Sequence, residues 1–190
     1  ALSNPPARLA NSSKPWMRFS QAPHQRKRVG TSKPNQSRIV AALLPAGDAR
    51  SLLSLSQHTS ELTHVCVEML GVSGQPARLT TDLDEEVFAA VRASGLQILP
   101  MLTNLAGNHW DTDAVEGLIR ADSTTQQTFA DQVVKALQHI GAAGLLIDWQ
   151  GIDPALSAEL VQFLGRMHSK LSAEKLELWL SIPVGEDLRA

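Results

Sequence analysis

Short apolar segments alternate with amphipathic helical patterns along most of this chain, and this alternation limits the folds it can adopt. The apolar segments, typical of buried strands, span 38–46, 63–70, 96–104, 142–149 and 176–184. The helical patterns span 49–57, 82–95, 111–122, 124–141 and about 153–171. Because parallel strands need a crossover that is usually a helix, the alternation predicts an α/β fold, with a parallel sheet covered by helices.

Two architectures fit such a sheet, a doubly wound open sheet and a (β/α)8 TIM barrel. No glycine-rich nucleotide-binding turn follows any of the predicted strands, so the doubly wound sheet lacks its main sequence signal. A whole barrel needs eight strands in roughly 250 residues. With five strand segments in 190 residues, the barrel interpretation makes this chain five N-terminal strand-helix units of an incomplete barrel.

Residues 1–37 differ in composition from the rest and form a predicted basic, disordered linker or tail. Residues 1–38 contain eight Lys and Arg and no acid, whereas the remaining 152 contain nine against 19 acids. The first segment has no apolar period and cannot bury enough surface to offset its ordering entropy. Its basic run at 26–28 could bind nucleic acid or anionic lipid, but a solvated linker is the favoured interpretation, so we expect no nucleic-acid partner. The barrel-like domain is predicted to span 38–190.

Several classes of chemistry lack the residues they need. Cys66 is the only cysteine, so no internal disulfide can form, and no histidine motif accompanies it. Neither a Cys/His metal pattern nor an apolar run long enough to cross a membrane is present. No G-x-S-x-G elbow supports Ser-His-Asp catalysis. We therefore expect no metal and no cofactor. The start at Ala1, without a methionine, suggests a piece of a longer protein.

Polar and aromatic side chains follow the predicted strands, at the edge where ligands bind in both architectures. They combine carboxylates, amides and tryptophans, a mixture typical of a sugar-binding cleft. Some have structural alternatives: Asp111 could cap the next helix, and Trp149 could face either the site or the core. Glu68 stands in an apolar strand, where a charge without a partner is costly. The candidate site residues are Glu68, Asn104, Trp110, Asp111, Asp148, Trp149 and Gln150.

The fourth strand segment carries a resemblance to a known family. Residues 142–150, AAGLLIDWQ, resemble the signature strand of the family-18 glycoside hydrolases, D-G-x-D-x-D-x-E. Gly144 matches the glycine and Asp148 matches the last aspartate. Ala143 and Leu146 occupy the two earlier aspartate positions. Gln150 occupies the position of the catalytic glutamate.

The surrounding sequence extends the resemblance over about residues 38–188. Residues 96–149 are similar to the chitinase-like subgroup that includes spore peptidoglycan hydrolases. They also resemble hydrolase-like modules fused to bacterial polysaccharide deacetylases and family-2 glycosyltransferases. Both groups share a PLLTN…G…(W/F)D strand end followed by a FDGINIDFE-like strand. EML at 68–70 resembles the PEWL of the fused modules.

The resemblance implies a TIM barrel and a substrate-assisted retaining mechanism. In the family, the glutamate at the position of Gln150 protonates the leaving oxygen, and the acetamido group of the sugar attacks the anomeric carbon. The aspartate at the position of Asp148 orients that acetamide. The implied partner is a polysaccharide or N-acetylated glycan, such as chitin or peptidoglycan. The implied location is extracytoplasmic: periplasmic, cell-surface or secreted. Fusion to further catalytic domains is also implied.

Gln150 departs from this pattern, because a glutamine amide has no proton to give near neutral pH. The favoured hypothesis is therefore a carbohydrate-binding hydrolase-like module, a pseudoenzyme within a cell-envelope or polysaccharide-processing protein. A second hypothesis is a working glycosidase that uses Asp148, Asp111 or Glu68 as its acid. A third is an unrelated α/β scaffold domain.

Strand geometry adds a prediction about the site. Residues two apart on a strand point to the same side, so Asp148 and Gln150 are expected to face the barrel axis and Trp149 the helices. The third strand neighbours the fourth in a barrel. We therefore expect Asn104 and Trp110 to share a cleft floor with Asp148 and Gln150.

Overall fold

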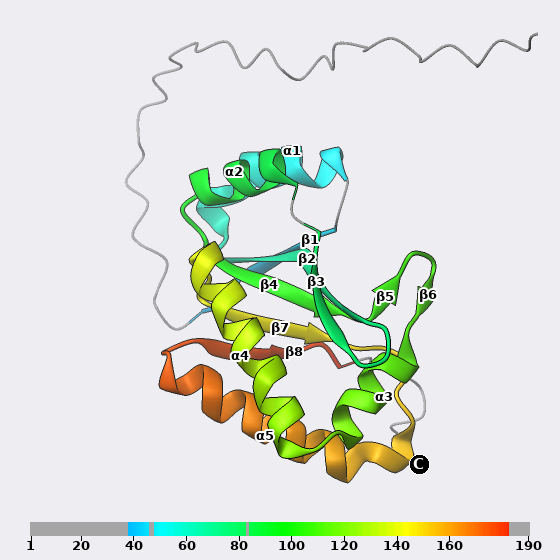
Figure 1. The fold of residues 1–190 in the computed structure, drawn as a ribbon. Helices are drawn as coiled ribbons and strands as arrows, with labels where there is room; N and C mark the ends of the chain where they lie inside the picture. The colour runs from blue at the N-terminus through cyan, green and yellow to red at the C-terminus, as the bar shows by residue number, and fades with distance from the viewer. Residues whose placement is uncertain (1–37, 46–47, 83, 183–190) are drawn as a thin grey trace, which may run out of the picture. The chain divides into compact units, whose positions relative to one another are not determined.

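The computed structural model describes residues 38–45, 48–82 and 84–182, and the predicted tail at 1–37 lies outside them. Five parallel strands lie side by side in chain order, β1-β2-β4-β7-β8, with all arrows pointing the same way (Figure 1). This order confirms the predicted parallel sheet and fits a barrel rather than a doubly wound sheet, whose strand order reverses. The strands are Ala41–Leu44 (β1), His64–Ser73 (β2), Gln97–Thr103 (β4), Gly144–Asp148 (β7) and Glu177–Leu180 (β8).

Helices connect these strands, and most begin at an aspartate cap. Asp48, Asp84, Asp111 and Asp122 each accept a backbone N–H from the first turn that follows. The last helical pattern was expected over about 153–171. Asp153 and Pro154 instead start a short 3-10 turn, Pro154–Leu156, that precedes the helix itself. The helices are Ala49–His58 (α1), Glu85–Ala93 (α2), Thr112–Arg120 (α3), Ser123–Ile140 (α4) and Ser157–Ala173 (α5), with a 3-10 turn at Thr59–Glu61.

Three short strands were not expected from the sequence: β3 joins the sheet, and β5 and β6 form a separate two-stranded sheet. β2 continues to Ser73, and its second half pairs antiparallel with β3, Arg78–Thr81. β5 (Leu105–Ala106) and β6 (His109–Trp110) form a hairpin after β4 that projects past the sheet (Figure 1). Segments of two to four residues are too short to show a strand period, so only their pairing partners reveal them.

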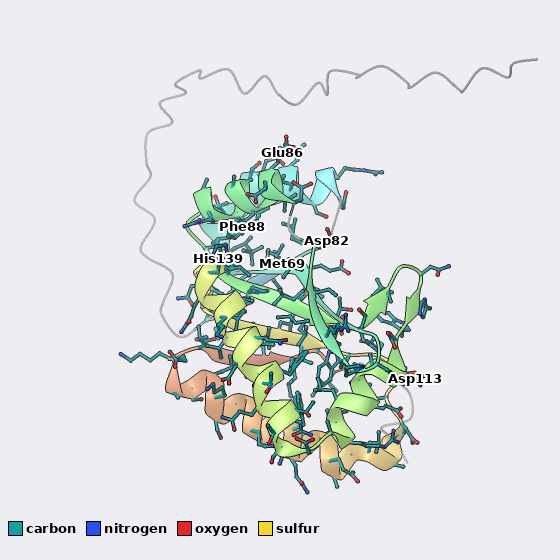
Figure 2. All side chains as sticks on the ribbon, viewed as in Figure 1. Met69, Asp82, Glu86, Phe88, Asp113 and His139 are labelled. Carbon is teal, nitrogen blue, oxygen red and sulfur yellow. The ribbon has the colours of Figure 1, made fainter. Side chains whose placement is uncertain are left out.

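Apolar residues on alternate strand positions face either the helices or the concave side of the sheet. The helix-side core contains Val65 and Val67 of β2, and Figure 2 shows Met69 of the same strand near Phe88 of α2. The concave side, here called the inner face, carries a smaller apolar cluster: Cys66, Leu99 and Leu146, with Met101 and Trp179 against them. The sheet is therefore covered by helices on one side only, as in the wall of a barrel.

The sheet is strongly curved. The rings of His64 on β2 and Trp179 on β8 lie 5.0 Å apart, centroid to centroid, although β4 and β7 separate their strands. Three inter-strand steps span about 14 Å in a flat sheet, so these side chains can meet only where the inner face is concave. This curvature brings inward-facing side chains together.

The sheet stays open within the described residues. β1 and β8 form its two parallel edges, and it does not close into a complete barrel. Apolar side chains are exposed beside the β8 edge, with Leu180 44% and Ile182 70% accessible. These exposures agree with the expected open edge of a partial barrel.

Outside the sheet, a buried glutamine joins three helices. The Gln126 side chain on α4 is buried, and its Nε2 donates to the carbonyl oxygens of Leu118, Ile119 and Ala121 at the end of α3. Its Oε1 accepts from Arg166 Nε of α5 at 2.8 Å. The amide thereby satisfies carbonyls that a helix C-terminus leaves without intrahelical partners.

Gly144 at the start of β7 allows that strand to approach β8. A Cβ built on Gly144 would lie within 2.4–2.8 Å of the backbone and Cβ of Glu177, its partner in the β7–β8 ladder. Gly165 of α5, in contrast, has no neighbouring atom within 4 Å of such a Cβ.

We predict opposite effects of alanine at these two glycines. Gly144→Ala should destabilise the domain by about 1–3 kcal/mol, because the methyl forces β7 and β8 apart. Gly165→Ala should stabilise it by about 0.4–1 kcal/mol, because alanine restricts the unfolded chain. Urea unfolding of both variants tests this. Equal free energies of unfolding for the two would show that β7 and β8 do not approach as closely as described.

Candidate functional site

The carboxyl ends of β4 and β7 lie next to each other and form the centre of the candidate site. Their ladder pairs Met101 with Leu146 and ends where Thr103 meets Asp148. Both strands stop at this point, so the chain after each one can diverge and leave room for polar side chains. Parallel α/β sheets bind their ligands at this edge.

Asp148 and Gln150 contact each other directly. Gln150 Nε2 donates to Asp148 Oδ1 at 2.7 Å, and both residues are half-buried. Trp149 between them is buried on the other side, where its ring packs on Phe163 of α5 with centroids 5.5 Å apart. The alternation expected from strand geometry is therefore present, with the aspartate and glutamine on one side and the tryptophan against the helices.

Asn104 links the two strand ends through its side chain. It is fully buried. Its Oδ1 accepts from the backbone N–H of Gln150 at 2.9 Å, and its Nδ2 donates to the carbonyl of the same residue at 3.0 Å. The structure thus brings Asn104, Asp148 and Gln150 together. The sequence placed Asn104 in the site, but it did not predict that the side-chain amide hydrogen-bonds to the backbone of Gln150.

Asp111 anchors the segment that follows β4. Its Oδ1 accepts from Ala114 N and caps α3, and its Oδ2 accepts from Gly74 N in the β2–β3 turn. Its own N–H donates to the carbonyl of Asn104 at 2.8 Å. Both carboxylate oxygens therefore bind backbone groups, and the capping role considered from the sequence is present. No sequence pattern predicts the contact with Gly74, because this residue lies 37 positions from Asp111 along the chain.

Trp110 and Glu68 lie at different places around this centre. Trp110 is 43% exposed on the β5–β6 hairpin and pairs across it with Leu105, which is 38% exposed. Glu68 is partly buried on β2 beside Met101 of β4. Since Met101 pairs with Leu146, Glu68 lies one inward-facing level below Asp148 on the sheet.

On β4 and β7 the inner face below Asp148 is apolar. Leu146, which occupies an aspartate position of the signature, is buried with Cys66 and Leu99. Burial also raises the pKa of the Cys66 thiol, which favours the unreactive protonated form. Within the described ranges no group of three or more His, Cys, Asp or Glu residues could hold a metal ion. No helix in that part of the chain is long and apolar enough to cross a membrane.

Comparison with known proteins identifies relatives by structure only. No protein-family model matches the chain, and no curated protein matches it. The class V chitinase of Pseudomonas fluorescens Pf-5 matches with a TM-score of 0.69 at 20% identity, over 76% of this chain and 44% of that one. A chitinase of Chromobacterium violaceum ATCC 12472 matches with a TM-score of 0.66 at 17% identity, over 77% and 46%. The Bacillus cereus spore cortex-lytic enzyme SleL matches at 0.64 and 16%, over 75% and 34%.

These similarities concern the fold. The chain spans less than half the length of the matched enzymes, in agreement with a partial barrel. The predicted likeness to the chitinase and spore-hydrolase group is thus confirmed for the fold: the described strands and helices form part of a barrel like that of these enzymes.

We predict that Asp111 contributes mainly to stability. Asp111→Ala should lower the free energy of unfolding by about 1 kcal/mol or more, because the α3 cap and the tether to Gly74 are both lost. Asp113→Ala, which removes an exposed acid from the same helical turn, is the matched control. Urea unfolding measures both. Equal stability of the two variants would contradict the anchoring role.

Proposed function

We propose that this domain binds an N-acetylated glycan at the strand ends of β4 and β7 and does not hydrolyse it. The observation that carries this proposal is the contact between Gln150 and Asp148, at 2.7 Å on the inner side of β7. The glycan class is supported by the fold, which is shared with chitinases and a spore cortex-lytic enzyme. We expect the domain to belong to an extracytoplasmic, cell-envelope or polysaccharide-processing protein, with further catalytic domains fused to it.

The chemistry of the pair suits recognition of an acetamido group. An ionised carboxylate has about four lone-pair sites, so Asp148 can accept further N–H or O–H donors besides Gln150. The glutamine carbonyl oxygen is another acceptor for a sugar hydroxyl. The exposed Trp110 on the neighbouring hairpin offers an apolar ring for a sugar face.

The same pair argues against hydrolysis. A glutamine cannot protonate the leaving oxygen, and a well-placed general acid typically contributes about 10²–10⁴-fold in rate. Leu146 fills an acid position of the signature with a buried apolar side chain. The alternative acids are less suited: Asp111 uses both oxygens on backbone N–H groups, and Glu68 lies below the strand ends. These placements favour the binding hypothesis over a working glycosidase.

Replacing the amide by an acid should give activity. In Gln150→Glu, two carboxyl groups stand where Gln150 and Asp148 now make a hydrogen bond, so one of them should hold a proton near neutral pH. We expect hydrolysis of a chromogenic chitobioside to rise by about 10²–10⁴-fold over the wild-type protein. Gln127→Glu, an exposed position on α4, is the control and should stay inactive. Wild-type turnover as fast as that of Gln150→Glu would contradict the proposal of an inactive module.

Binding itself should depend on Asp148. Calorimetry with chitooligosaccharides on the full-length protein should detect binding by the wild type and a loss of about tenfold or more for Asp148→Ala, since a charge-assisted hydrogen bond is removed. Asp153→Ala, which removes a nearby acid that caps the next turn, is the control. Absence of wild-type binding, or equal binding by Asp148→Ala, would mean that the site is not used for glycans.

A further inference from the structure

We propose that Asn104 is a positioning residue whose side-chain amide replaces a strand backbone and holds residue 150 against Asp148. Its effect on glycan affinity rests on the proposed function. The positioning step concerns the protein alone and can be tested separately.

The β4–β7 ladder ends just before Asn104. Backbone pairing stops at Thr103 and Asp148, because β4 turns away into the β5–β6 hairpin. Thr103 Oγ1 accepts from Leu105 N at 3.0 Å at this turn, and the Asn104 carbonyl accepts from Asp111 N. The Asn104 carbonyl is therefore committed to the hairpin, and its side chain bonds to the segment after β7.

The Asn104 amide matches the backbone groups of Gln150 chemically. In an extended residue, the N–H and the C=O point to the same side, toward a neighbouring strand. The Asn104 amide offers one acceptor and one donor to that pair on Gln150, at 2.9 and 3.0 Å. Asn104 is fully buried, so water cannot replace either bond without opening the site. Among side chains of this length, only an amide or a protonated carboxyl can both accept and donate.

Residue 150 is held both through its neighbour and through its own backbone. Trp149 packs on Phe163 behind the sheet, and the Asn104 amide hydrogen-bonds to the backbone of Gln150. With its backbone placed in this way, the Gln150 side chain folds back to Asp148. Further along the loop, Glu116 Oε1 accepts from Asp153 N at 3.1 Å, a separate tether that does not involve residue 150.

Amide hydrogen exchange of the Gln150 N–H, measured by NMR on the full chain, tests the positioning. We expect exchange in Asn104→Leu to be at least about tenfold faster than in the wild type, because both bonds are lost. Glu116→Ala removes the other tether and should leave this exchange unchanged. Wild-type protection of Gln150 in a folded Asn104→Leu protein, or equal loss of protection in Glu116→Ala, would overturn the proposal.

A second variant keeps the test decisive if leucine prevents folding. In Asn104→Asp, the introduced carboxyl can accept and donate when protonated but only accept when ionised. Relative to the wild type at each pH, Gln150 should be protected at about pH 5, where burial favours the neutral carboxyl. At about pH 8 the ionised carboxylate has no proton to donate to the Gln150 carbonyl oxygen, and the repulsion between these two acceptors should open the segment and speed exchange of the Gln150 N–H about tenfold. The wild type corrects for the titration of the acids around this position, Asp148 on β7, Asp111 before α3 and Glu68 on β2. Protection that does not change with pH would overturn the proposal.

Glycan titration then separates the two proposals. Chitooligosaccharide affinity of Asn104→Asp should match that of the wild type at about pH 5 and fall about tenfold at about pH 8, in parallel with the exchange. If exchange responds as expected while the wild type binds no glycan, the positioning role holds and the proposed function fails. If affinity is unchanged when Gln150 loses protection, Asn104 does not position a binding residue.

Discussion

The candidate site depends on the parallel pairing of β4 with β7. This ladder sets Thr103 beside Asp148 and ends both strands at one level of the sheet. The polar contacts at the centre of the site depend on both strands ending at this same level. The amide of Asn104 can reach the backbone of Gln150 because the two chains are still one strand spacing apart when regular pairing stops. A shift of one residue in this register would turn the aspartate toward the helices.

Curvature of the sheet brings the side chains on its inner face together. The approach of Trp179 to His64 across two intervening strands shows that inward-facing side chains converge. Lower on the inner face of β4 and β7 these side chains are apolar, and Leu146 is one of them. Glu68 lies at the level of Leu146, and the hydrogen-bonded cluster of Asn104, Asp148 and Gln150 lies where the strands end. A row of carboxylates along β7, as the family signature has it, would here place charge among buried apolar groups at a high desolvation cost. Leu146 and Gln150 both leave out a charge that the signature has on this strand, so these two departures are consistent with each other.

The loops around the site are fixed by hydrogen bonds between segments that are distant in sequence. Asp111 joins the end of the hairpin to Gly74 of the β2–β3 turn and to the start of α3. Glu116 of α3 holds the loop after β7 at Asp153. A site with such supports is preorganised, because the groups that meet a ligand need little reordering when it binds. Such supports are what the proposed binding by Asp148 and Gln150 would need.

Periodicity and caps in the sequence determined the larger elements. Apolar runs and aspartate caps were sufficient to predict the five parallel strands, the helices between them and the facing of Asp148, Trp149 and Gln150, because these features depend on neighbouring residues. Contacts between distant segments were decided only by the tertiary structure. The pairing of β3 with the end of β2, the use of Gln126 as a cap for α3, and the link from Asp111 to Gly74 have no local signal. Asn104 shows the difference most clearly: its sequence position marked it as a site residue, but its task was set by a backbone 46 residues away that comes within 3 Å only when β4 and β7 pair.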